Sequence, residues 1–587
     1  MSVEQTSINQ LITDNIDIWT STVKTKSASG RGSSKKRELY GVKKLRELIL
    51  ELAVRGQLVS QDPTDEPASV LLERIEKEKD SLIKEKKIRK PLKTEQIGSD
   101  EAPFELPVGW EWRRLVHLVT VLGDGLHGTP EYSENGEYFF VNGNNLSNGS
   151  IQIKPETKRV SEEQYLKHKK DLNDRTVLVS INGTLGNVGF YNNEAVMLGK
   201  SACYFNLFQG ISKDYIKRLI ESPYFRNYAF SAATGSTIKN LGLKAMNNFV
   251  LAVPSEVEQN RIVAKVDELM TLCDQLEQQT EASIEAHQVL VTTLLDTLTN
   301  SDDADELMQN WARISEHFDT LFTTEASIDQ LKQTILQLAV MGKLVPQDPN
   351  DEPAAKLLER IAEEKAQLIK EKKIKKQKAL PPVSDDEKPF ELPNGWEWAR
   401  FLDISTLITD GAHHTPTYVN EGVPFLSVKD MSGGSLDFGD TRFISQDQHI
   451  ELTKRCKPLK GDLLLTKVGT TGIPILIDTD REFSLFVSVA LIKFFKNEID
   501  GEYLALLVKS PFVKQQSASG TQGVGNKNLV LKTIAAFMLA IPPHHEQKRI
   551  VSMVNALIPV CDQLKARLKD SQTTQIHLTD AIVEQAV

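Results

Sequence analysis

Cysteine is scarce in this chain, and long hydrophobic runs are missing. The four cysteines among 587 residues stand far apart, without the paired spacing of a zinc site or a disulfide framework, so we expect reduced thiols used in packing. No apolar run approaches the roughly 20 residues that cross a bilayer, and the polar, acid-containing start is unlike a signal peptide. The sequence therefore predicts a cytoplasmic protein without a membrane partner.

Signatures of catalysis are also missing. Gly199-Lys-Ser201 lacks the glycine that a phosphate-binding Walker loop needs five residues earlier, because Glu194 stands there. The stretch Gly183–Gly189 is rich in glycine, but no dinucleotide fingerprint follows it. The sequence also has no Asn/Asp-Pro-Pro-Tyr/Phe element of an amino-methyltransferase. We therefore expect a non-catalytic chain that holds no cofactor of its own.

Adjacent histidines raise the question of a metal site. Of His413 and His414, only the first has a counterpart, His127, and no second ligand lies at helical or loop spacing. A turn stabilised by Asp and His beside Thr-Pro is the interpretation that we favour over metal binding. We expect no metal.

Charge of one sign does not dominate. A net charge of −10 argues against a uniformly basic nucleic-acid binder but leaves local patches open. Residues 105–253 hold 16 Lys and Arg against 14 Asp and Glu, and residues 391–541 hold 15 against 17. Lysine-rich runs at 84–90 and 370–376 fit either a solvated helix end or a patch for phosphate, and both interpretations stay open.

What the chain does have is a long internal repeat. Leu52–Pro67 returns 286 residues later as Leu338–Pro353, and Phe104–Trp112 returns as Phe390–Trp398, nearly letter for letter. A period this long indicates two whole domains in tandem, related by a pseudo-two-fold axis if they pack together.

Each copy has the same order of patterns. Apolar residues at three-and-four spacing, interrupted by an acidic, proline-containing stretch, predict a helical hairpin. About 150 residues rich in Gly, Asn and short β-type runs follow, which are typical of a mixed α/β domain, and then a long helix begins after a proline. The predicted segments are a flexible tail at 1–37, hairpins at 38–103 and 329–389, globular domains at 104–254 and 390–542, long helices at 255–300 and 543–587, and a linker at 301–328.

A heptad pattern of about six repeats runs along each long helix, which predicts a coiled-coil seam. Ser283 and His287 interrupt the first seam, as Ser571 and Gln575 interrupt the second. Polar residues at seam positions fix the alignment of the paired helices at a cost in stability, and this is the role that we expect here. The alternative is that these residues contact another subunit. We interpret His287 as a seam residue rather than a ligand. The clearest seam positions are Ile262, Val266, Leu269, Cys273, Leu276, Ile550, Val554, Leu557, Cys561 and Leu564.

Several motifs together resemble the specificity subunit of Type I restriction-modification enzymes. They are Leu106–Trp112, Gly469–Gly472 and the Pro-x3-Glu-Gln-x-Arg-Ile-Val stretches that end at Val263 and Val551. The resemblance covers essentially everything after residue 38, and the Leu-Ala-Val-x-Gly-x-Leu-Val blocks look like the group labelled type IB. It implies an α+β fold in which two target recognition domains are joined by long antiparallel coiled-coil helices in a pseudo-two-fold tandem repeat.

The resemblance also implies a function and partners. Each target recognition domain would read one half of an asymmetric, bipartite site on double-stranded DNA, and the chain would direct partners to adenine methylation or DNA cleavage. The partners would be two modification (methyltransferase) subunits and restriction (translocase/nuclease) subunits, which would hold S-adenosylmethionine, ATP and Mg²⁺. The alternative is a tandem-repeat scaffold that binds protein and has no DNA specificity.

Base reading should fall where the copies diverge, because shared residues cannot tell different half-sites apart. Asn142–Asn145 aligns with Val428–Met431, and Thr234–Asn240 aligns with Ser519–Asn528. Asn and Gln pair bidentately with adenine, and Lys reaches guanine acceptors or phosphates. The predicted DNA contacts are Asn142, Asn144, Asn145, Asn182, Thr184, Ser236, Thr237, Lys239 and Asn240 in the first domain, and Lys429, Lys467, Thr470, Thr521, Gln522, Asn526, Lys527 and Asn528 in the second.

Overall fold

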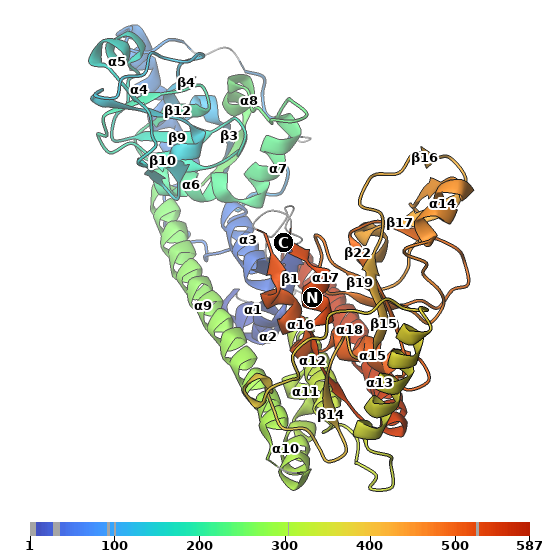
Figure 1. Cartoon of the computed structure of the whole chain (residues 1–587). Helices are drawn as coiled ribbons and strands as arrows, with labels where there is room; N and C mark the ends of the chain where they lie inside the picture. The colour runs from blue at the N-terminus through green and yellow to red at the C-terminus, as the bar shows by residue number, and fades with distance from the viewer. Residues whose placement is uncertain (1–7, 27–35, 91–93, 99–100, 303, 524–526) are drawn as a thin grey trace. The chain divides into compact units, whose positions relative to one another are not determined.

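The computed structural model describes residues 8–26, 36–90, 94–98, 101–302, 304–523 and 527–587. It divides into two compact units: unit 1 is Met1–Ser283 with Ser571–Val587, and unit 2 is Ile284–Asp570. Two helices belong to both units, α9 (Glu256–Asn300, 45 residues) and α18 (His544–Ala586, 43 residues). Both are labelled in Figure 1. Each unit therefore combines one copy of the repeat with the end of the other copy's long helix.

Unit 1 begins with ordered elements that the sequence did not predict. The expectation of a flexible tail over 1–37 is wrong for residues 8–26, because Trp19 is fully buried and the Thr22 hydroxyl lies 3.1 Å from that of Thr579 on α18. Burial of one large aromatic outweighs the polar composition of the segment. Residues 1–7 and 27–35 of that prediction lie outside the described residues. The elements here are α1 (Ile8–Asp14), α2 (Ile16–Ser21), β1 (Val23–Lys26) and β2 (Lys36–Leu39), with β1 and β2 antiparallel.

A helical hairpin is present in each unit. Its first helix packs an apolar face into the core, as the three-and-four spacing predicts, and a proline precedes the second helix in both copies. The helices are α3 (Tyr40–Val54) and α4 (Ala68–Lys84) in unit 1, and α12 (Glu325–Val340) and α13 (Ala354–Lys370) in unit 2.

The most closely repeated blocks form one joint in each unit. Gly56 has φ +69° and lies so close to Pro107 and Trp110 that a Cβ would not fit, and the amide of Ala68 donates to the carbonyl of Gly109 over 2.8 Å. The indole of Trp110 donates to the Glu258 carboxylate at the start of α9 over 2.9 Å. The second copy repeats these contacts with Gly342, Pro393, Trp396, Ala354, Gly395 and Glu546. The repeated blocks are nearly identical because in each unit they form the joint that links the hairpin, the globular domain and the long helix.

Globular domain 1 (residues 104–254) contains two main sheets. One has the order β10-β9-β12-β4 and is antiparallel throughout; the other has the order β11-β5-β8, with β11 and β5 parallel. The strands are β3 (Glu111–Arg114), β4 (Val119–Asp124), β5 (Tyr138–Val141), β6 (Leu146–Ser147), β7 (Ser150–Ile151), β8 (Arg159–Val160), β9 (Thr176–Ser180), β10 (Val188–Phe190), β11 (Val196–Leu198), β12 (Ala202–Leu207) and β13 (Val250–Val253). The helices are α5 (Glu162–His168), α6 (Lys213–Glu221), α7 (Pro223–Ala232) and α8 (Leu243–Asn248), with 3-10 turns η1 (Leu115–His117) and η2 (Gly143–Asn145).

Globular domain 2 (residues 390–542) repeats this plan, with sheets ordered β15-β22-β19-β20 and β16-β18-β17-β21. The strands are β14 (Glu397–Arg400), β15 (Ser405–Asp410), β16 (Tyr418–Val419), β17 (Val423–Leu426), β18 (Arg442–Ile444), β19 (Leu463–Thr466), β20 (Pro474–Leu476), β21 (Ser484–Leu485), β22 (Val489–Phe494), β23 (Thr521–Gln522), β24 (Asn528–Leu529) and β25 (Met538–Ile541). The helices are α14 (Gln446–Thr453), α15 (Gly501–Lys509), α16 (Pro511–Ser519) and α17 (Leu531–Ala535), with the 3-10 turn η4 (Val428–Met431). A further 3-10 turn, η3 (Asp385–Glu387), precedes the domain. The predicted α+β tandem fold is confirmed.

The predicted seam residues lie on the inner side of the long helices. In the first seam all five are at most 9% exposed, and in the second Ile550, Val554 and Cys561 are buried while Leu557 and Leu564 are half-buried. In unit 2 this face of α18 shares a hydrophobic core with α12, and Lys332 pairs with Asp562 at 2.7 Å. In unit 1, Arg46 of α3 pairs with Asp274 and Glu277 of α9, both at 2.7 Å. The heptad pattern therefore serves packing on the hairpin helices.

The end of α9 enters the core of unit 2. Val291, Leu295 and Leu298 belong to the same hydrophobic cluster as α12 and α18, and the His287 imidazole lies 3.1 Å from the carbonyl of Thr320. His287 is therefore a hydrogen-bonded packing residue. The segment that we expected to be a linker holds two helices, α10 (Ala304–Glu316) and α11 (Phe318–Leu321).

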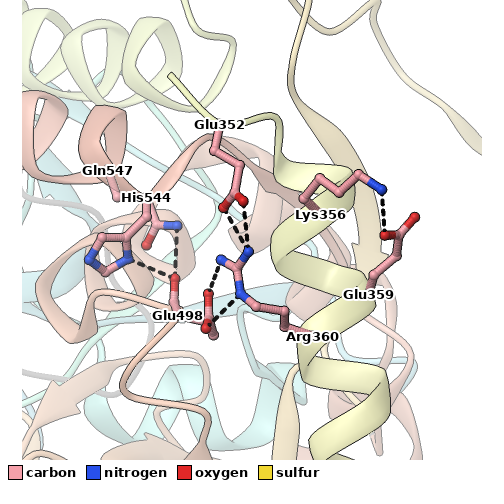
Figure 2. A network of polar contacts seen from close by, with 7 residues as sticks. All are labelled: Glu352, Lys356, Glu359, Arg360, Glu498, His544 and Gln547. Atoms are coloured by element: carbon pink, nitrogen blue, oxygen red, sulfur yellow. Dashed lines mark hydrogen bonds and ion pairs between the residues drawn. The ribbon is translucent and has the colours of Figure 1, made fainter. Parts of the chain in front are cut away.

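An ion-pair network secures α13 in unit 2 (Figure 2). The Arg360 guanidinium donates to the Glu352 carboxylate at 2.7 and 2.9 Å and to the Glu498 carboxylate at 2.6 and 3.0 Å. The carbonyl of Glu498 in turn lies 2.9 Å from the His544 imidazole of α18. In unit 1, Arg74 pairs with Glu66, and Gly210 stands where unit 2 has Glu498, so the second carboxylate of the network has no counterpart at that position. The two copies thus differ in how firmly charge holds the hairpin.

All four cysteines are free and buried, as the sequence predicts. Desolvation raises the pKa of Cys273 to about 11 and that of Cys456 to about 12, so both thiols stay protonated at neutral pH. Within the described ranges, no helix combines the length and hydropathy needed to cross a membrane.

Candidate nucleic-acid interface

Strand ends bring several loops of domain 1 to one edge of its sheets. The register pairs Cys203 with Asp124 and Ala202 with Ser180, so β4 and β9 end where β12 begins. The parallel pair β5 and β11 ends at the same place, and residues 199–201 connect β11 to β12. We call this the loop edge of domain 1; it comprises residues 124–130, 142–145, 182–186, 199–201 and 234–240. Its equivalent in domain 2 comprises residues 410–416, 427–430, 468–472, 486–488, 521–523 and 527–528.

A serine joins the loops of each edge. In domain 1 the Ser201 hydroxyl donates to the side-chain oxygen of Asn142 and accepts from the amide of Gly143, both over 2.9 Å, and its carbonyl accepts from the amide of Ile181 over 3.0 Å. Sequence reasoning missed this role because it tested Gly199-Lys-Ser201 only as a Walker loop. In domain 2, the Ser488 hydroxyl accepts from the amide of Val428 over 3.1 Å, and the Ser488 carbonyl accepts from the amide of Lys467 over 2.9 Å.

The serine contacts correct the alignment of the two 3-10 turns. In η2 a capping box joins Asn142 and Asn145, and in η4 the equivalent box joins Ser427 and Asp430. Asn142 therefore corresponds to Ser427, one residue earlier than the alignment drawn from the sequence. Both asparagines of the box use their side chains inside the turn, and Asn145 is only 6% exposed. The side-chain oxygen of Asn142 and both ends of the Asn145 amide are therefore occupied by contacts within the fold.

Asn144 is the residue of η2 whose side chain is exposed, and its counterpart in η4 is Lys429. The Lys429 ammonium lies 2.7 Å from the carbonyl of Asp440, and its side chain is 51% exposed. The same position therefore presents an amide in one domain and an ammonium in the other.

A glycine loop and a variable loop lie side by side in both domains. The amide of Gly183 donates to the carbonyl of Lys239 over 2.9 Å, and Asn182 donates from its side chain to that of Asn240 over 3.2 Å. In domain 2 the amide of Gly469 donates to the carbonyl of Lys527 over 3.0 Å, and Val468 forms a bridge with Asn528. Thr184 and Thr470 occupy the same exposed position in the glycine loops.

The variable loops differ in form as well as sequence. In domain 1, Ser236, Thr237 and Asn240 are exposed and Lys239 is half-buried. In domain 2 the loop is a hairpin of β23 and β24, in which Gln522 and Lys527 are exposed, Asn528 is half-buried, and the Thr521 hydroxyl donates to the carbonyl of Ser517 over 2.6 Å. Asn526 lies outside the described residues.

The side chain of Lys467, unlike most of the other predicted contacts, is buried. Its side chain is 6% exposed, and its ammonium lies 3.1 Å from the carboxylate of Asp410 and 3.3 Å from the carbonyl of Val487. The equivalent position in domain 1 is Ile181, which is also buried. The ammonium neutralises a buried carboxylate, so the expectation that Lys467 touches DNA is replaced by a structural role.

Across the part of the chain that the structure describes, no three His, Cys, Asp or Glu side chains are grouped so as to hold an ion. His127 and His413 each bond the aspartate three residues earlier. What the loop edges offer is a set of amides, hydroxyls and ammonium groups on a rigid frame, which suits hydrogen bonding to base edges and phosphates.

Comparison with known proteins defines the class. The family model described as "Type I restriction modification DNA specificity domain" matches residues 107–286 and 393–571, which in each copy of the repeat cover the globular domain and part of the long helix that follows. The chain is 41% identical over 606 residues to the Type I restriction enzyme EcoEI specificity subunit of Escherichia coli, covering 99% of this chain and all of that one. It is 39% identical over 612 residues to the EcoAI specificity subunit of the same species, with the same coverage. The crystal structure of the HsdS subunit from Thermoanaerobacter tengcongensis aligns over 83% of this chain and 98% of that one, with 16% identity and a TM-score of 0.36.

The duplicated frame with unlike loops fits a protein that recognises a ligand through its loop edges. The chain belongs to the family of Type I restriction-modification DNA specificity subunits, the non-catalytic components of those complexes. The interpretation as a protein-binding scaffold without DNA specificity is thereby excluded.

Proposed function

We propose that this chain is a type IB-like specificity subunit that reads an asymmetric, bipartite DNA site, one half with each globular domain. The observation that carries the proposal is the pair of loop edges: the same serine-tied frame holds different exposed side chains, an amide at Asn144 and an ammonium at Lys429. Two frames with different surfaces read two different half-sites. The type IB subgroup is supported by the Leu-Ala-Val-x-Gly-x-Leu-Val blocks, which form the joint of each unit.

The proposed contacts are the exposed or half-buried polar residues of the loop edges. Asn142, Asn145 and Lys467 leave the set because their side chains serve the fold. In domain 1 the contacts are Asn144, Asn182, Thr184, Ser236, Thr237, Lys239 and Asn240. In domain 2 they are Lys429, Thr470, Thr521, Gln522, Lys527 and Asn528, with Asn526 retained from the sequence.

Catalysis and most phosphate neutralisation belong to partners in this proposal. Two modification subunits would supply S-adenosylmethionine for adenine methylation, and restriction subunits would supply ATP- and Mg²⁺-dependent cleavage, in the cytoplasm. Domain 1 carries a charge of +2 and domain 2 a charge of −2 over the ranges counted above, whereas phosphate neutralisation normally supplies the bulk of DNA affinity. We therefore expect this chain alone to bind DNA weakly, and tight, site-specific binding by the lone subunit would contradict this.

The long helices are proposed to set the distance between half-sites. At 1.5 Å per residue, a helix of 45 residues is about 68 Å long, comparable to two turns of DNA. The proposed division of the chain into hairpins, target recognition domains and spacer helices follows the predicted boundaries, with α9 and α18 as the spacers.

A domain exchange tests the proposal. Residues 104–254 are replaced by the corresponding residues of a relative with a different known site, and methylated adenines are mapped in a host that carries the modification subunits. One half of the methylated sequence should change to that of the relative, while the other half and the gap stay as they were. The reciprocal exchange of residues 390–542 is the matched control and should change the opposite half. An unaltered methylated sequence in both chimaeras would overturn the proposal.

A further inference from the structure

One segment of the loop edge is shared by both domains although the loops around it diverge. Asp-Gly-x-His-x-Thr-Pro-x-Tyr occurs at Asp124–Tyr132 and again at Asp410–Tyr418. A side chain common to both domains cannot distinguish two half-sites, so its role at this edge has to be independent of base sequence. On DNA, the group that is independent of sequence is the phosphate.

The fold holds this segment rigidly. Gly125 follows the last residue of β4 and approaches the carbonyl of Leu198 so closely that no Cβ would fit there. The next residue, Leu126, is fixed on both sides: its amide donates to the carbonyl of Leu198 over 2.8 Å, and its carbonyl accepts from the amide of Lys200 over 3.0 Å. Pro130 is buried at the far end.

Domain 2 repeats this anchoring. Gly411 meets the carbonyl of Leu485, and Ala412 donates to Leu485 over 2.8 Å and accepts from Val487 over 2.9 Å. Pro416 is buried. The two segments therefore present their exposed residues in the same way.

Between the anchors, a histidine and a threonine face solvent. The His127 Nε2 lies 2.6 Å from the Asp124 carboxylate while its side chain is 70% exposed, and the His413 Nε2 lies 2.9 Å from the Asp410 carboxylate with 62% exposure. An ionised carboxylate only accepts hydrogen bonds, so Nε2 carries a proton and Nδ1 is left for a ligand. Thr129 and Thr415, two residues further on, are exposed in both domains.

We propose that the His-x-Thr pair of each domain binds one phosphate of the DNA backbone: His127 with Thr129, and His413 with Thr415. When Nδ1 also carries a proton, the imidazole donates from both nitrogens, to the carboxylate through Nε2 and to a phosphate oxygen through Nδ1. The threonine hydroxyl adds a neutral hydrogen bond. Asp124 and Asp410 act as positioning residues that fix the ring. The inference rests on the proposed function, because it assumes that the loop edges face DNA.

Nearby charge favours an anion at this place. In domain 1, exposed Lys200 is bonded through its backbone to the segment. In domain 2, the side chain of Arg455 reaches the carbonyl of Asp410 over 2.8 Å and is 54% exposed, while buried Lys467 offsets the Asp410 carboxylate. Domain 2 thus places two cationic side chains at its carboxylate, and domain 1 has one exposed lysine in the chain segment bonded to Leu126.

The test uses the chain assembled with its modification subunits. Affinity is measured over a range of salt for two duplexes, one with the methylated sequence mapped in the host and one of unrelated sequence. His127→Ala and His413→Ala should each weaken binding about tenfold on both duplexes, and the double variant about a hundredfold, since the two sites belong to different domains and act independently. The slope of log affinity against log salt should fall by about 0.9 for each phosphate that the variant no longer neutralises. The methylated sequence should be unchanged.

His414→Ala is the matched control. This exposed histidine lies beside His413 on the same segment, but Gly128 replaces it in domain 1, and the residue three positions before it is Gly411 rather than an aspartate. Its removal should change affinity less than twofold. Thr129→Val, which keeps the shape of the side chain, should weaken binding of both duplexes about threefold, and thermal unfolding shows whether each variant is folded. Weakening confined to one duplex, an altered methylated sequence, or an effect of His414→Ala equal to that of His413→Ala would overturn the phosphate contact.

The outcome for the wild-type complex separates the two proposals. If the wild-type complex shows no preference for the mapped duplex, the proposed function is wrong. A wild-type complex with that preference, together with folded His127→Ala and His413→Ala variants of unchanged affinity, removes only the phosphate contact.

Discussion

Asn144 and Lys429 occupy the same position in the two globular domains. Each is the exposed second residue of a 3-10 turn that a capping box closes, and the backbone amide of the residue before it donates to the equivalent serine of its loop edge, Ser201 or Ser488. The frame holds the backbone in place while the side chain is free to differ. An amide and an ammonium at one position fit the proposal that the two domains read different half-sites.

Exchanging these two side chains should alter one half-site at a time. Asn144→Lys is expected to change the preferred base at one position of the half-site read by domain 1, and Lys429→Asn at one position of the other. A good bidentate contact contributes about 1–3 kcal/mol of discrimination, so the preference should change by roughly 5- to 150-fold. Mapping methylated adenines in the host measures this.

A second asparagine provides the control for this exchange. Asn192 is exposed in domain 1 but lies between β10 and β11, outside the loop edge. Asn192→Lys adds the same charge and should leave the methylated sequence intact. If Asn144→Lys also left it intact while the complex still methylated DNA, this position would not read a base.

Lys467 should matter for stability and not for recognition. Lys467→Ile introduces the residue that domain 1 has at this place but leaves the Asp410 carboxylate, only 2% exposed, without its ammonium partner. Removing one member of a buried pair costs roughly 3–5 kcal/mol, and we expect the low end because His413 and Arg455 still contact Asp410. Urea unfolding measures the loss of unfolding free energy. Lys429→Ala is the control, because this lysine is exposed. Adding Asp410→Asn to Lys467→Ile should restore part of the lost unfolding free energy. Unchanged stability with weaker DNA binding would show that the lysine contacts DNA after all.

Periodic sequence patterns predicted the helices and domains. The surface formed by the loop edges could not be predicted in this way, because it depends on contacts between residues far apart in the sequence. The seam residues from Ile262 to Leu276 have the predicted helix and burial because a heptad repeats one local rule over several turns. The N-terminal segment gave no such signal: Trp19 is buried where α2 packs on α3, and Thr22 meets Thr579 of α18 from the other end of the chain. The burial of Lys467 likewise depends on Asp410, 57 residues earlier. The one-residue shift at Asn142 became visible only through Ser201.

The buried glutamate of each joint should make stability fall as pH rises. Desolvation raises the pKa of Glu546 above 4.5, although hydrogen bonds from Gln347 and Trp396 act in the opposite direction. From about pH 4.5 up to the raised folded-state pKa, the folded chain binds more protons than the unfolded chain, so this group lowers the free energy of unfolding as pH increases. Glu258 in unit 1 behaves in the same way.

Neutral variants isolate this contribution. In Glu546→Gln the side chain no longer titrates. As pH rises above 4.5, the unfolding free energy of the variant should therefore increase relative to that of the wild type. Urea unfolding at several pH values between about 4.5 and 7 measures this difference, with Glu363→Gln on the exposed face of α13 as the control. A difference that is constant over this range would show that Glu546 has the same pKa in the folded and unfolded chain.

Lengthening the long helices should change the gap in the DNA site in steps set by helix geometry. Ser283 and Ile284 mark the point where α9 passes from unit 1 to unit 2, and Asp570 and Ser571 mark it in α18. Three heptads inserted at both points add about 31 Å, close to one turn of DNA at roughly 34–36 Å, so both domains would again meet the same side of the duplex. We expect methylation of the same half-sites with about nine additional unread base pairs. A single inserted heptad adds about 10 Å, or roughly three base pairs, and puts the half-sites about a third of a turn out of phase, so methylation should fall steeply. Methylome mapping of both variants decides the matter, and an unchanged gap in the three-heptad variant would mean that the helices do not set the spacing.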